Sequence, residues 1–349
     1  MDKSPAFQKY KKDRKRHCVI LLCMFILLIV LIIVFVAIGT MQVSAKDVFS
    51  VIWSKIFDIT LAVPANIISV VWEIRLPRIL CSALAGAGLA VSGVIFQAIL
   101  GNPLADPYTL GISTGAAFGA SFAILLNTVY GFMIPVSPVA LSFALLTLGL
   151  VIFTAGNGSG FPVTNLIISG IIVGSVLSSG ISLIKMLAGE SVSAIVFWLM
   201  GSFSAKKWDD IMILAPSIIV CCVIVIIFSE EMNILSLGDK SAYSLGLRVK
   251  RSRLMFLCLG SVMTAVSVSL CGVIGFVGLI IPHLFRMWVT ADNRVLVPLS
   301  AFGGALLLLI ADNATRIFTN GEIPVGIVTT MLGGPFFIWI FTRRKREAD

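Results

Sequence analysis

The chain has 349 residues, of which 58% are hydrophobic and only 12% are charged. Soluble domains carry about 25% charged residues, so this composition excludes an ordinary soluble protein. The net charge is +9, but the basic residues lie in loops and at the two ends of the chain. There is no folded basic domain, which argues against a nucleic-acid partner. We expect anionic lipid headgroups beside these residues instead.

Ten apolar segments along the chain are candidates for membrane spans. A spanning helix needs about 20 apolar residues, because the hydrocarbon core is about 30 Å thick and each residue rises about 1.5 Å. The sequence lacks the ten-residue alternation of a membrane β-barrel, so it predicts an all-α, polytopic membrane helical bundle of about ten transmembrane helices. We expect the spans at 18–39, 77–100, 107–127, 136–155, 165–188, 210–228, 253–272, 275–289, 296–318 and 324–341. The eighth span is short and is expected to be partial or tilted.

The basic residues set the orientation of the bundle. Of the 26 Lys and Arg residues, 18 lie before the first span, after the last, or in the loops after the sixth and eighth. Cytoplasmic loops carry the excess of Lys and Arg, so we expect both chain ends in the cytoplasm, as an even number of spans requires. The first apolar segment exceeds the roughly 7–15 residues of a signal-peptide core and has no A-x-A-like cleavage site, which favours an uncleaved span.

This topology divides the chain into three parts. Residues 1–17 form a basic cytoplasmic tail, residues 18–341 a single transmembrane domain, and residues 342–349 a second cytoplasmic tail. The segment 40–74 is interrupted by charges too often to cross the membrane, so we expect it on the outer surface as short helix and extended chain. The loop 231–252 is also too polar to span, and it lies on the cytoplasmic side.

Three arginines are predicted at the outer ends of spans. Arg75 and Arg78 flank Pro77 just before the second span. Arg316 lies four residues after Asp312, so the two share one helix face. Guanidinium groups stay charged and bind carboxylates through two parallel hydrogen bonds. From the residues alone, their candidate partners are lipid headgroups for Arg75 and Arg78, and Asp312 within the chain for Arg316.

The fifth span combines membrane length with a high density of small polar residues. They are Ser169, Ser175, Ser178, Ser179 and Ser182. Such a density suggests a water-accessible face that lines a cavity. The alternative is close packing of helices, since small residues let backbones approach each other in lipid, where no hydrophobic force drives helices together.

Two regions of the chain resemble the signature regions of one known family. They read RLPRILCSALAGAGLAVSGVIFQAILGNPLADPYTLGISTGAAFG (75–119) and GVIGFVGLIIPHLFRMW (272–288), and both are similar to the FecCD (or BtuC-like) permeases of ABC importers. The resemblance covers residues 18–341 and implies a type II ABC importer permease that moves an iron chelate (siderophore) inward. The same machinery for haem or cobalamin is the alternative.

The resemblance also implies roles for particular residues. Arg75, Arg78 and Arg316 would dock carboxylates of an extracytoplasmic substrate-binding protein, and the serines of the fifth span would line the pathway between two permease subunits. The residues Val163, Thr164 and Asn165 would lie at the cytoplasmic gate. The loop 231–252 would form coupling helices in a cleft of the ATPase through Leu235, Leu237, Gly238, Asp239, Ala242, Leu245, Gly246 and Leu247.

Other features indicate that this chain works in an assembly. It has no G-x-x-x-x-G-K-[ST] phosphate loop, so we expect ATP and Mg²⁺ on two separate ATPase subunits and no cofactor or catalytic site here. Its two histidines, His17 and His283, form no cluster with cysteines or carboxylates, so no metal site is expected. The expected assembly contains a second permease subunit, identical or homologous, in the cell (inner or sole cytoplasmic) membrane of a bacterium.

Two functions of another class remain as alternatives. A secondary transporter driven by an ion gradient would use a membrane-embedded carboxylate, and Asp312 is the main candidate. Arg316 is placed to neutralise that carboxylate, which weakens this alternative. An intramembrane enzyme would need a nucleophile and a base in proximity, and no such pair is visible in the sequence.

Overall fold

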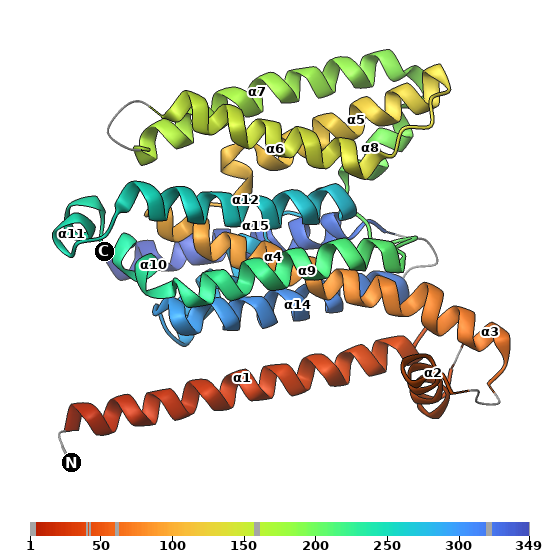
Figure 1. Cartoon of the computed structure of the whole chain (residues 1–349), viewed down its shortest axis with the longest axis horizontal. Helices are drawn as coiled ribbons and strands as arrows, with labels where there is room; N and C mark the ends of the chain where they lie inside the picture. Colours follow the sequence, from red (N-terminus) through yellow and green to blue (C-terminus); the bar gives the residue numbers. More distant parts are fainter. Residues whose placement is uncertain are drawn as a thin grey trace.

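The computed structural model describes residues 5–39, 41, 43–59, 63–156, 161–318 and 323–348, and every regular element in these ranges is helical. In chain order the elements are α1 (Pro5–Ala37), α2 (Ala45–Phe57), α3 (Ala65–Ile68), η1 (Ser69–Arg75), α4 (Leu76–Ile99), η2 (Pro107–Leu110), α5 (Ile112–Tyr130), α6 (Val136–Ala155), α7 (Val163–Ala188), η3 (Gly189–Ser191), α8 (Val192–Leu199), α9 (Trp208–Ile227), α10 (Ser229–Leu235), α11 (Asp239–Ser244), α12 (Val249–Cys271), α13 (Val277–Trp288), α14 (Asn293–Phe318) and α15 (Val325–Ala348). The long helices run roughly side by side, with α5, α6 and α7 in one layer and α4, α9, α12 and α14 in another (Figure 1).

The predicted membrane bundle is confirmed. In the described ranges, eight helices are long and apolar enough to cross a bilayer, and two shorter apolar helices are Val277–Trp288 and Val325–Ile338. α1 begins at Pro5, well before the predicted start of the first span at residue 18. The reason is that residues 6–17 contain neither Gly nor Pro and are rich in Lys and Arg, which favour helices.

α4 is the central helix, and its most extensive neighbour is α14. Glycines allow this close approach. A Cβ atom on Gly86 would lie 2.1 Å from the carbonyl oxygen of Gly304 in α14, and one on Gly93 would lie 1.9 Å from that of Gly278 in α13. Small residues are what permits such backbone contact between helices in lipid. The two contacts therefore fix α4 against its neighbours on two sides.

A non-helical segment, residues 272–276, separates α12 from α13. It begins at Gly272 (φ 75°) and ends at Phe276 (φ 70°), a left-handed conformation that is rare for a bulky residue. The chain then returns to α4, where the side-chain amide of Gln97 donates to the carbonyl oxygen of Gly278 (3.2 Å). α13 therefore has only 12 residues, which agrees with the short eighth span predicted from the sequence.

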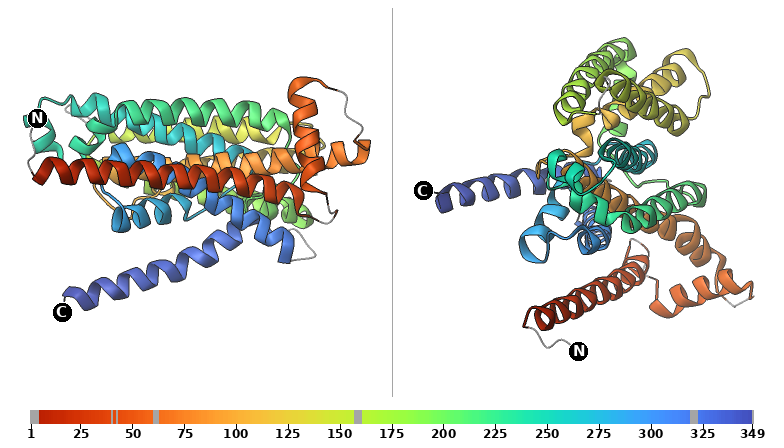
Figure 2. Two further views of the ribbon diagram at one scale, coloured as in Figure 1. Left: turned by 90° about the horizontal axis from the view of Figure 1, so that it is seen from below. Right: turned by 60° about the vertical axis from the view of Figure 1, so that its left-hand side comes forward.

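The two ends of the bundle are built differently. The chain termini lie at the same end as α10 and α11, while α2 and α3 lie at the opposite end (Figures 1 and 2). The distribution of basic residues makes the end with the termini cytoplasmic. The outer segment 40–74 is more helical than predicted, because α2, α3 and η1 fill most of its described part. α2 forms because Ser44 caps its first turn through the amide of Asp47 (3.1 Å) and because Val48 and Val51 are buried.

Candidate functional site

Two of the three predicted docking arginines bind the C-terminal end of α1. Arg75 is 4% exposed, and its guanidinium donates to the carbonyl oxygens of Val36 (2.8 Å) and Ala37 (3.0 Å). Arg316 donates to the carbonyl oxygen of Phe35 (2.8 Å). The last four carbonyls of a helix have no partner within it and carry the negative end of its dipole. The two arginines therefore cap α1 and attach it to η1 and α14.

The third arginine joins α4 to α14. Arg78 donates to both carboxylate oxygens of Asp312, from Nε to Oδ2 (2.8 Å) and from Nη2 to Oδ1 (2.9 Å). Asp312 is buried, and the bidentate pair replaces the hydration that its carboxylate loses. The alternative of an Asp312–Arg316 ion pair is wrong, because Arg78 holds the carboxylate and Arg316 binds α1. Docking by these arginines stays a prediction.

The serines of the fifth span lie on α7 and point mostly away from the rest of the chain. Ser169 is buried, whereas the other four are exposed: Ser175, Ser178, Ser179 and Ser182. The opposite side of α7 packs through glycine, since a Cβ atom on Gly170 would lie 2.6 Å from the carbonyl oxygen of Thr109. The exposed hydroxyls of Ser175, Ser179 and Ser182 donate to carbonyls one turn earlier. α7 thus presents a face, exposed in the described part of the chain, on which four serines lie among the apolar side chains of Ile168, Ile171 and Met186.

The predicted gate residues form the first turn of α7, at the cytoplasmic end. Val163 is half-buried, and Thr164 and Asn165 are exposed. Pro162 precedes the helix, and its carbonyl accepts the amide of Leu166 (3.1 Å). This turn lies on the same helix as the serine face, so a movement of its start would be transmitted along α7. The gate assignment itself stays a prediction.

The predicted coupling segment contains two short helices, α10 and α11, with turns on either side of α11. Gly238 (φ 90°) and Gly246 (φ 81°) form these turns, in a conformation that favours glycine. Leu235 and Ala242 are buried and pack in the main core. These two residues therefore anchor the segment to the bundle and are not available as contacts for a partner, contrary to the prediction.

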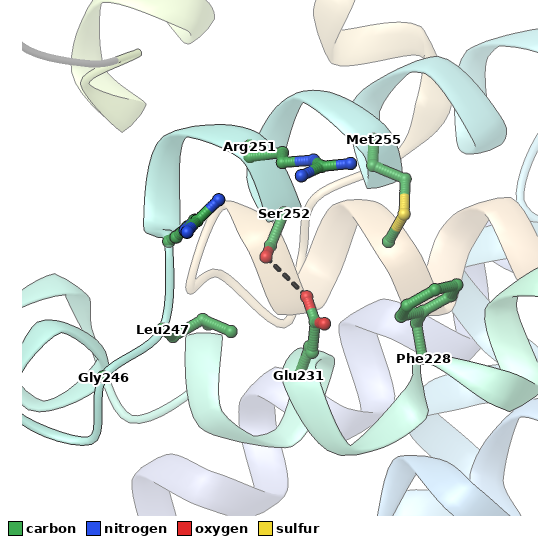
Figure 3. Close-up of a pocket in the computed structure, with 8 residues that line it drawn as sticks. Phe228, Glu231, Gly246, Leu247, Arg251, Ser252 and Met255 are labelled. Carbon is green, nitrogen blue, oxygen red and sulfur yellow. Dashed lines mark hydrogen bonds between the residues drawn. The ribbon is translucent and has the colours of Figure 1, made fainter.

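The other apolar residues of this segment are exposed. Leu237, Tyr243 and Leu245 are each more than half exposed, and we call these three residues the coupling surface. Leu247 is half-buried and lines a cavity of about 420 Å³ between α10 and the first turns of α12. Figure 3 shows this cavity, with the hydroxyl of Ser252 directed at the carboxylate of Glu231 across it.

Polar side-chain contacts hold the coupling segment in two directions. Arg253 in α12 donates to the carboxylate of Asp239 at the start of α11 and to the carbonyl oxygen of Phe161 before α7. The hydrogen bonds from Arg253 lower the pKa of the Asp239 carboxyl. On the other side, Asn233 in α10 donates to Asp292 before α14 (2.7 Å). Sequence reasoning counted Arg253 only as a loop charge, because its partners lie 14 and 92 residues away.

The described residues contain no group of three or more His, Cys, Asp or Glu that could hold a metal ion. The ionisable residues reported above instead contact one another, backbone carbonyls or neutral polar side chains. The candidate site residues thus fall into three groups. The arginines join helices, the serines lie on the exposed face of α7, and the coupling surface is apolar and lies at the cytoplasmic end.

Comparison with known proteins gives these features a common context. A model of the FecCD transport family matches residues 27–343. The cobalamin import system permease protein BtuC of Halobacterium salinarum is 39% identical over 286 residues, which cover 82% of this chain and 77% of that protein. The Fe(3+)-citrate import system permease protein YfmE of Bacillus subtilis is 33% identical over 344 residues, which cover 97% of this chain and 99% of that protein.

A solved structure agrees with these sequence relatives. It is a metal-chelate type ABC transporter in an inward-facing conformation, with a TM-score of 0.78 and 33% identity, and the match covers 93% of this chain and 99% of that chain. The likeness thus extends over both signature regions, the α7 face and the coupling segment. The chain belongs to the FecCD transport family and is a membrane permease of the ABC importer type, whose ATPase is a separate subunit.

Proposed function

We propose that this permease carries an iron chelate of the siderophore type inward across the cell membrane of a bacterium. It would work with a second permease subunit, two ATPase subunits and an extracytoplasmic substrate-binding protein. The observation that carries the proposal is the uncovered face of α7, where four serines lie on a helix long enough to span the bilayer. A pathway for a polar chelate needs such a surface, and lipid does not.

A second permease subunit would cover this face. The small serine side chains let another helix approach closely, or leave room for a substrate between two subunits. The hydroxyls of Ser175, Ser179 and Ser182 already have carbonyl partners within α7, so these side chains tolerate both a dry and a hydrated environment. An identical or a homologous partner would serve equally well in this arrangement.

The coupling surface would contact the ATPase. Leu237, Tyr243 and Leu245 are exposed at the cytoplasmic end, where an apolar group gains from burial against a partner. ATP and Mg²⁺ would bind to that partner, and its closure would shift the permease between inward- and outward-facing states.

The outer arginines would attract the binding protein. Three guanidinium groups and one carboxylate, that of Asp312, lie at the outer end near α1, so this cluster has a positive net charge. Arg75 and Arg316 bind carbonyl oxygens, and no carboxylate is paired with either of them in the described residues. A carboxylate of the binding protein would complement the cluster and guide docking. Because Arg75 is buried, Arg78 and Arg316 are the better candidates for direct contact.

Iron chelates are proposed as substrates because relatives include a ferric citrate permease and a metal-chelate transporter. Cobalamin is the alternative that the relative from Halobacterium salinarum supports, and haem is a further one. A secondary transporter is disfavoured, since Asp312 is held by Arg78 and the family works with an ATPase.

The test is purification of the tagged chain from native membranes, followed by mass spectrometry of the proteins that accompany it. We expect a phosphate-loop ATPase and a substrate-binding lipoprotein, and iron in the ligand of the latter. Recovery of cobalt in that ligand would replace the iron chelate by cobalamin. Active transport by the chain alone in liposomes without ATP would overturn the proposal.

A further inference from the structure

Arg253 connects three separate parts of the cytoplasmic end. It is 3% exposed and lies in the second turn of α12. Its guanidinium donates to both carboxylate oxygens of Asp239, the first residue of α11, and to the carbonyl oxygen of Phe161 (3.1 Å). One side chain therefore binds the coupling segment and the chain that leads into α7 at the same time.

Phe161 is well placed to position α7. It lies two residues before the helix begins, so its carbonyl group fixes the direction in which the chain enters the first turn. Its ring is buried in the main core, and the ammonium group of Lys250 lies 5.7 Å from the ring centroid. Two cations from the start of α12 thus hold Phe161, one through its carbonyl oxygen and one through its ring.

The guanidinium group suits this connection for a chemical reason. Its planar fork can donate to a carboxylate and a carbonyl simultaneously, whereas an ammonium group binds as a point charge. The Asp239 side chain is 46% exposed, so it keeps part of its hydration while Arg253 is buried. Burying a charged group is costly unless it is paired, and the pairing here makes α11, α12 and the start of α7 one connected unit.

The other contacts of the coupling segment lead elsewhere. α10 is held to the start of α14 by Asn233, which donates to Asp292 and accepts the amide of Asn293 (2.8 Å). Ser252 binds Glu231 in α10. Among these side-chain contacts, the Arg253 contact is the one that reaches α7. Arg253 therefore provides a direct polar connection from α11 to the chain that leads into α7.

We propose that Arg253 is a positioning residue that transmits the displacement of α11 to the first turn of α7. When the ATPase moves the coupling surface, Asp239 moves with α11, and Arg253 moves the carbonyl of Phe161 and so the start of α7. This inference rests on the proposed coupling role of α11. It adds the specific connection by which that movement reaches the helix with the serine face.

The experiment is hydrogen–deuterium exchange on the complete complex of permease and ATPase in lipid nanodiscs, with and without ATP and vanadate. The variants are Arg253→Met, which removes both contacts, and Asp239→Asn, which removes the ion pair and keeps the contact with Phe161. Arg251→Met is the matched control, because Arg251 is an exposed arginine in the same part of α12. Melting temperatures establish that each variant is folded.

In the wild type and in Arg251→Met, we expect nucleotide to change exchange in both α11 and residues 163–168. In Arg253→Met and Asp239→Asn, α11 keeps its protection by the ATPase, and the response of residues 163–168 falls by about fivefold or more. An unchanged response at residues 163–168 in both variants would overturn the connection. If Arg253→Met does not fold, Asp239→Asn decides. Failure of the ATPase to bind the wild type would instead contradict the proposed function.

Discussion

α4 and α7 have equal mean hydropathy in their most apolar windows, yet they are placed very differently in the molecule. In the window of the apolar stretch Ala65–Ile99, which ends in α4, 83% of the residues are buried, whereas in that of Val163–Leu199, which begins with α7, 28% are. Hydropathy thus identifies both as membrane helices, but it does not show whether their side chains pack against other helices of the chain or remain exposed. The small residues make that distinction.

In α4 the small residues contact other helices of the same chain. Gly86 and Gly93 bring its backbone against α14 and α13. In α7 the side that carries Gly170 packs in this way, whereas four serines lie on the exposed side of the helix. The exposed face of α7 is where the proposed partner subunit or pathway would lie, whereas α4 packs within the bundle.

The largest expected effect follows from replacing Gly93 by Leu. A Cβ atom there would lie 1.9 Å from the carbonyl oxygen of Gly278, so α4 and α13 would have to separate. We expect loss of folded protein, measured as the monodisperse peak in detergent size-exclusion chromatography. The matched control is Gly149→Leu in α6, because no atom lies within 4 Å of a Cβ at that position. Equal yields from the two variants would contradict the close packing of α4.

A second prediction concerns the exposed residues of the coupling segment. Leu237→Asp combined with Leu245→Asp places two charges on the coupling surface, where the side chains are exposed. We expect the permease to fold and to lose its ATPase on purification, since a charged group in an apolar interface is costly. Co-purification is the measurement. Retention of the ATPase by the double variant would show that the interface lies elsewhere.

A third prediction concerns the serine face directly. Ser178→Leu should leave the chain folded, because the side chain is exposed, and should lower ATP-driven uptake by about tenfold by narrowing the pathway. Ser217→Leu in α9 is the control, since Ser217 is a partly exposed serine in another membrane helix and its hydroxyl donates to the carbonyl one turn earlier (2.7 Å). Uptake would be measured in liposomes that contain the complete importer. Full activity of Ser178→Leu would contradict the proposal that the exposed face of α7 borders the pathway while α4 packs within the bundle.

The smallest effect is expected at the outer arginines. Arg316→Gln removes one charge from the cluster and retains a donor for the carbonyl of Phe35. We expect the affinity for the binding protein to fall several-fold, about 3-fold to 10-fold, with a weaker dependence on salt. Titration of the immobilised complex with the binding protein measures both. An unchanged affinity and salt dependence would leave Arg316 with its contact to α1 alone.

The sequence predicted the helices well and the contacts between them poorly. The ten apolar segments correspond to the eight long and two short apolar helices, because twenty apolar residues leave few alternatives in a bilayer. The helices of segment 40–74 were predicted only in part, as short helix and extended chain, since α2 owes its stability to Ser44 and to tertiary packing of Val48 and Val51 more than to length.

Ion pairs were the harder problem. Arg78 and Asp312 are 234 residues apart, and the neighbouring Arg316, four residues from Asp312, offered a local partner that the structure does not use. Arg253 was missed for the same reason, because its contact with Phe161 joins the start of α12 to the start of α7. Spacing along one helix reveals neighbours on that helix only, while pairs between helices depend on how the bundle assembles.

The central claim is that the serine face of α7 borders water inside the importer, whereas the exposed faces of other helices border lipid. Reaction of Ser178→Cys with a charged, membrane-impermeant maleimide, in nanodiscs that contain the complete importer, tests it most directly. Ser217→Cys in α9 and the wild type, with its own seven cysteines, are measured in parallel. We predict rapid labelling of Ser178→Cys above the wild-type background, a rate that changes when ATP and vanadate are added, and no labelling of Ser217→Cys. Equal and slow labelling of both variants in every state would contradict the claim.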